Sequence, residues 1–190
     1  NLDVNSGNNN YSTGLYIGAG SSFTINQNVN GACTINLNGA FAGEGNLMLV
    51  AANGNAGYAS KFVLGSQESS FSGNIFLAPK GTRPGGAILQ ITGAALANAT
   101  VDLSGSINHS SSALTLQIAN AASLAGLNDA DGFNGTHKGR VQSANSSRAN
   151  LTLTGNGNYT YGGSIGATTQ HSGVNGNTTP TGGINLIMAG

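Results

Sequence analysis

The chain has 190 residues, of which only 6% are charged, compared with about 25% in an ordinary soluble protein. Its six basic and six acidic side chains cancel, which removes the electrostatic attraction on which nucleic-acid binding and adsorption to acidic lipids depend. Disorder is disfavoured too, because disordered chains combine low hydrophobicity with high net charge, whereas 38% of these residues are apolar and many recur in pairs.

The predicted elements are short strands, each marked by two apolar residues with one residue between them. Such a pair places both side chains on one face of a strand, since successive residues point to opposite faces. Between Phe23 and Leu116 the pairs recur every 12 to 15 residues, and Gly- and Asn-rich turns separate them. In chain order the pairs are Leu2/Val4, Leu15/Ile17, Phe23/Ile25, Ile35/Leu37, Leu47/Leu49, Phe62/Leu64, Ile75/Leu77, Leu89/Ile91, Val101/Leu103, Leu114/Leu116, Leu151/Leu153 and Ile184/Leu186.

Helix competes with strand at 91–100 and 116–127, which are rich in Ala and Leu. Neither segment sustains an apolar stripe at helical spacing for three turns. We therefore expect one or two helical turns there and strands elsewhere.

Many short strands at regular spacing are typical of a β-solenoid or a β-sandwich. Aromatic residues make up only 6% of the chain and the connections are long, which favours a parallel β-helix over the sandwich. At roughly 20 to 25 residues per coil, the chain would form about eight coils. We expect 1–190 to be a single solenoid domain or a fragment of one. The spacing leaves open whether a coil has two or three strands, and it gives no register for 117–150.

Residues 151–166 (LTLTGNGNYTYGGSIG) carry the most distinctive pattern. Spaced leucines, spaced glycines, a tyrosine, a glycine pair and an apolar residue follow one another at Leu151, Leu153, Gly155, Gly157, Tyr159, Gly162, Gly163 and Ile165. The pattern resembles the autotransporter-associated β-strand repeat, with weaker copies at 41–49 and 71–77. The resemblance implies a right-handed parallel β-helix that is exposed on, or released from, a Gram-negative cell surface.

The scarcity of charge fits stacked coils. Stacking places like residues above one another, and like charges in register repel, whereas Asn and Thr bind each other through hydrogen bonds. We therefore expect neutral polar ladders on the flanks of the solenoid.

The run 128–140 (NDADGFNGTHKGR) is the one charge-dense segment. Paired acids with a base are typical of β-helix polysaccharide lyases and hydrolases, so Asp129, Asp131, His137 and Arg140 are the catalytic candidates. Asp129, Asp131 and Asn134 are the candidate ligands for Ca²⁺. A solvated loop inserted between coils is the commoner role of such a run.

Other motifs carry little chemistry. Ser164 matches a Gly-x-Ser-x-Gly pattern, but no helix signal follows it. His109, His137 and His171 show no metal-binding spacing, and Cys33 is predicted to be buried and unreactive. No cofactor is expected.

Three functions follow from these observations. The first is a structural or adhesive extracellular module of a bacterial surface or secreted protein, with surface glycans as partners and no chemistry of its own. The second is a self-assembling fibre, since 1–7 and 183–190 read as ordinary strands that other copies would extend end to end. The third is a β-helix polysaccharide lyase or hydrolase. Neither nucleic acid nor direct membrane insertion is expected, because no run of 18 apolar residues occurs.

Overall fold

A computed structural model describes residues 1–5, 7–29, 31–51, 60–65, 69–79, 87–93, 96–104, 114–129, 139–166 and 182–189. Within these ranges every regular element is a strand, and every strand pairing is parallel. Paired strands belong to successive coils, so the chain winds into a parallel β-helix, as predicted. The β-sandwich alternative is wrong, because a sandwich is built from antiparallel pairs.

The strands form three sides. Side A stacks β1 (Leu2–Val4), β4 (Ser22–Gln27), β7 (Asn46–Ala51), β10 (Asn74–Pro79), β12 (Thr100–Asp102) and β14 (Gly126–Asn128). Side B stacks β2 (Asn9–Tyr11), β5 (Cys33–Leu37), β8 (Ser60–Leu64), β11 (Ala87–Gly93), the first half of β13 (Leu114–Leu124), β15 (Arg140–Ser143) and β17 (Ser164–Ile165). Side C begins with β3 (Leu15–Ile17), β6 (Phe41–Gly43) and β9 (Ser70–Phe71), and continues with the second half of β13, β16 (Ala149–Leu153) and β18 (Ile184–Met188).

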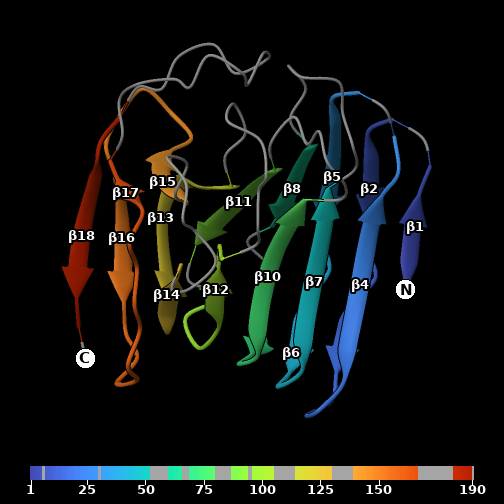
Figure 1. The fold of residues 1–190 in the computed structure, drawn as a ribbon, viewed down its shortest axis with the longest axis horizontal. Coiled ribbons are helices and arrows are strands. Elements are labelled where there is room, and N and C mark those ends of the chain that lie inside the picture. Colours follow the sequence, from blue (N-terminus) through green and yellow to red (C-terminus); the bar gives the residue numbers. More distant parts are fainter. Residues whose placement is uncertain are drawn as a thin grey trace.

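The strands lie side by side along the long axis of the molecule, with β1 at one end and β18 at the other (Figure 1). The two chain ends therefore lie at opposite ends of a short rod.

The 12-to-15-residue spacing of the apolar pairs corresponds to half a coil. Ile35/Leu37 lies on side B, Leu47/Leu49 on side A and Phe62/Leu64 on side B again. Rungs of side A, such as Leu47 and Ile75, lie 23 to 28 residues apart, because the third side and its corners add length. The expected eight coils are wrong for this reason, since the described part of side A has six rungs.

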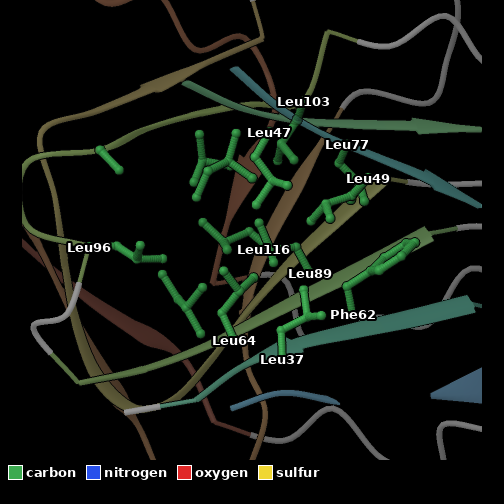
Figure 2. Packing of buried hydrophobic residues seen from close by; sticks show 14 of the residues in the cluster. Leu37, Leu47, Leu49, Phe62, Leu64, Leu77, Leu89, Leu96, Leu103 and Leu116 are labelled. Atoms are coloured by element: carbon green, nitrogen blue, oxygen red, sulfur yellow. The ribbon is translucent and has the colours of Figure 1, made fainter. Parts of the chain in front are cut away.

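Inward-facing aliphatic rungs form the core. Leu89 stacks on Phe62 below and Leu116 above, in register and fully buried. Side chains from opposing sides meet in the interior, where Leu64, Leu89 and Leu116 lie close to Leu47 and Leu49 (Figure 2). The alternation of buried and part-exposed residues along β5, β7 and β8 confirms that each apolar pair faces inward.

The helical turns expected in 91–100 and 116–127 are wrong where the chain is described. Residues 116–127 lie in β13 and β14, 91–93 end β11, and 96–98 form a turn. Strand β13 pairs with β11 on one edge and with β15 and β16 on the other. These hydrogen bonds between coils override the helix propensity of Ala and Leu. The pairing also supplies the missing register, in which Leu116 lies opposite Val141.

Candidate functional site

The charge-dense run 128–140 opens and closes on strands. Asn128 ends β14 and Arg140 begins β15, while Asp131, Asn134 and His137 lie outside the described residues. The structure therefore places two of the four catalytic candidates, Asp129 and Arg140, at the two ends of the run.

Asp129 holds these two ends together. Its backbone N–H donates to Thr160 O (2.9 Å), and it forms a parallel bridge with Tyr161 of the next coil. Its side chain is buried, and Oδ2 accepts a hydrogen bond from the backbone N–H of Gly139 (3.0 Å). A Cβ at Gly139 would lie 3.2 Å from that same oxygen, so glycine permits the close approach. This geometry is that of a clasp between two segments of backbone.

Tyr161 is the residue of this site that sequence reasoning missed as a partner of Asp129. Burial raises the pKa of the Tyr161 phenol, the nearby charge of Asp129 raises it further, and Arg140 opposes both effects. The Tyr161 hydroxyl donates to Ser164 O (3.3 Å). Burial lowers the pKa of Arg140. The three side chains act on one another across coils, and only the register of the solenoid reveals their proximity.

The remaining chemical candidates gain no partners in the described part of the chain. No group of three or more His, Cys, Asp or Glu side chains is found there, and two of the three proposed Ca²⁺ ligands, Asp131 and Asn134, lie outside it. Ser164 lies in β17 and is exposed, and its carbonyl serves Tyr161. His109 and His171, like His137, lie outside the described residues.

The repeat pattern at 151–166 has a packing explanation. The ring of Tyr159 lies against three glycines: an added Cβ would come within 2.2 Å of that ring at Gly126, 2.9 Å at Gly155 and 2.7 Å at Gly157. Gly163 likewise makes room for Tyr161, since its Cβ would lie 2.4 Å from the phenol oxygen. The spaced glycines therefore seat tyrosine rings across the end of side A.

The apolar members of the same pattern lie at the last coils. Leu151 is fully buried and Leu153 is half-buried. Ile165 stacks on Val141 in the inward register, as expected, but is 38% exposed.

Neutral ladders run along the flanks of the solenoid, as predicted from the lack of charge. Amide–amide hydrogen bonds join Asn36 to Asn10 (2.7 Å), Asn74 to Asn46 (3.2 Å), Asn145 to Asn120 (3.2 Å) and Asn185 to Asn150 (2.9 Å). In each pair one amide N–H₂ donates to the amide oxygen one coil away. The ladders leave an orderly flank of amides with further donor and acceptor capacity.

Cys33 is buried, as expected, at the corner between sides A and B. Its thiol donates to Gly7 O (3.0 Å), and the Ser60 hydroxyl donates to Gln27 Oε1 (2.8 Å), while Gln27 Nε2 donates to Val29 O (2.9 Å). Burial raises the pKa of the Cys33 thiol, and its hydrogen bond with Gln27 opposes that shift. The group is a buried polar network that fixes the corner.

Comparisons with protein-family models, with curated proteins and with solved structures found no match to this chain. In the described residues no helix is long and apolar enough to cross a membrane. The fold therefore defines the class, a three-sided parallel β-helix with neutral ladders on its flanks.

Proposed function

We propose that this chain is a structural and adhesive module of an extracellular bacterial protein, with no chemistry of its own. The observation that carries the proposal is the set of amide ladders in which Asn36 binds Asn10 and Asn74 binds Asn46. Amides held in register by the coils offer donors and acceptors at fixed spacing, and they carry no charge. Such a flank suits neutral polyhydroxylated partners, which are surface glycans.

The chain's charge supports the same proposal. A net charge of zero provides no long-range attraction, so contacts with a partner form through many short-range hydrogen bonds. Weak contacts repeated along a rod add up when the partner is itself a repeating polymer.

Binding of the purified protein to a panel of neutral and charged glycans tests the proposal. We expect binding to neutral glycans, and weaker binding by the double variant Asn36→Asp, Asn74→Asp, which places carboxylates in two ladders. The matched variant Asn36→Ser, Asn74→Ser keeps neutral hydrogen-bonding groups and is expected to retain most of the binding. Equal binding by the Asp and Ser variants, or no binding to any glycan by the native chain, would count against the adhesive role.

The extracellular location is part of the proposal and has its own test. Antibodies to the folded chain are expected to label intact cells of the organism that makes it, or to detect the protein in the medium. Signal that appears only after lysis would contradict this location.

The glycan-processing alternative needs a separate assay. Asp129 is buried in the clasp, so its replacement would change stability as well as any activity. Asp131→Asn is therefore the cleaner test. Release of new sugar ends by the native chain, and its loss in this variant, would replace the adhesive module with an enzyme.

A further inference from the structure

Both ends of the rod present an open apolar core. At the N-terminal end a cavity of about 170 Å³ is lined by Leu2, Tyr11 and Leu15, one residue from each side of the first coil. Phe23 and Phe41 of the second coil close it from above.

The opposite end offers apolar side chains instead of a hollow. Strand β18 stacks Leu186 on Leu151 and Met188 on Leu153, in the inward register. Nothing in the described residues covers them, and they are 43% and 70% exposed. β18 is therefore an inward-facing rung whose upper surface is bare.

The strand edges at the two ends are also compatible. Ala189 N–H donates to Leu153 O, so Met188, one residue earlier, directs its own N–H away from β16. At the other end Leu15 N–H donates to Ala40 O, so Tyr16 directs its N–H away from the second coil. Both outward edges belong to side C, and they lie at opposite ends of the rod (Figure 1). A copy shifted along the axis keeps all strands parallel.

The residues of the two edges match in phase and in charge. Leu15 and Ile17 face inward with one residue between them, as Leu186 and Met188 do. In the first described coil the charged side chain is Asp3, whereas the last described coils carry Arg140 and Arg148. Head-to-tail contact brings opposite charges together, and head-to-head contact brings like charges together.

We propose that copies of this chain stack head to tail, with β18 of one copy pairing with β3 of the next. Leu186 then lies over Leu15 and Met188 over Ile17, and the bare rung of one copy covers the cavity of the other. The interface is heterologous and does not close on itself, so it produces filaments of indefinite length. This inference deepens the structural role proposed above but does not require glycan binding.

Proline at an outward-pointing position removes one edge N–H without breaking the existing ladder. Met188→Pro blocks the C-terminal edge, Tyr16→Pro blocks the N-terminal edge, and Met188→Leu and Tyr16→Phe are the matched controls. In sedimentation velocity and electron microscopy we expect the native chain and both controls to form filaments that lengthen with concentration. Each Pro variant alone is expected to stay at 18.8 kDa.

Mixing the two Pro variants gives the decisive result. Each keeps one open end, so an equimolar mixture is expected to form particles of two copies and nothing longer. A native chain that stays monomeric at high concentration would overturn the proposal and indicate that further coils of a longer polypeptide cover these ends. Filaments that persist in either Pro variant would overturn it as well.

Two controls separate folding from assembly. Circular dichroism and thermal unfolding verify that each Pro variant keeps its strands. If one does not, the double variant Tyr16→Cys, Ile187→Cys replaces it, since these outward residues lie opposite each other in the stack, at a separation that a disulfide spans. Oxidation is expected to give ladders of covalent multimers, and purely monomeric product would contradict the stack. Monomeric Pro variants that still bind glycans would leave the adhesive proposal intact.

Discussion

Replacing Leu89 with Ala tests whether the stacked rungs provide the stability of the coil. Leu89 is fully exposed to the core and not to solvent, with a relative exposure of 0%, and it lies between Phe62 and Leu116. Removing three carbons forfeits about 2.4 kcal/mol of transfer free energy, at about 0.8 kcal/mol for each. The coils above and below are fixed by parallel hydrogen bonds, so the cavity cannot collapse fully. A total loss of about 3 to 5 kcal/mol in the free energy of unfolding follows.

Urea titration and thermal unfolding followed by circular dichroism measure this loss. For a chain of this length the expected decrease in Tm is roughly 10 °C. The control is Gln90→Ala, the next residue of the same strand, which faces outward and is expected to change stability by no more than about 0.5 kcal/mol. Similar losses for Leu89 and Gln90 would refute the inward assignment of β11.

Three further predictions concern the last coils. Gly126→Ala places a Cβ 2.2 Å from the ring of Tyr159, so the ring must leave its seat; an increase in Tyr159 exposure, measured by tyrosine fluorescence in a chain with Phe at the other tyrosines, checks this, and an unchanged spectrum would contradict it. Asp129→Ala removes the acceptor for the Gly139 N–H and should destabilise the fold by about 1 to 3 kcal/mol, measured by urea titration, whereas an unchanged midpoint would show that the clasp contributes nothing. Because the raised pKa keeps Tyr161 protonated in the fold, the unfolded chain loses this proton first; the free energy of unfolding should therefore fall above about pH 10, and Tyr161→Phe should flatten that decline.

The parts of the fold that could be predicted are those encoded locally. An apolar pair such as Phe62/Leu64 marks an inward face through the two-residue period of a strand, and the structure confirms it. Side C escaped notice because β6 and β9 contain three and two residues, too few to show alternation. Its corners lengthened each coil and made the expected coil number too high.

The contacts of the candidate site depend on register and not on local pattern. Asp129 and Tyr161 are neighbours only because β14 and the segment after residue 160 lie in successive coils. Gly126 and Tyr159 are brought together in the same way, although each belongs to a different predicted strand. A segment such as 116–127 also shows why composition misled: Ala and Leu favour helix in isolation, but pairing on both edges holds this segment as strand.

The account's central claim is that successive coils stack in parallel register, and spin-label distances test it most directly. Asn10, Asn36, Gln117 and Gln142 belong to one outward column of side B, in the order β2, β5, β13 and β15. At about 4.8 Å per rung, we expect a backbone separation of about 14 Å between Asn36 and Gln117, and about 24 Å between Asn10 and Gln142. Distances that do not grow by this increment with each coil would contradict the parallel stack.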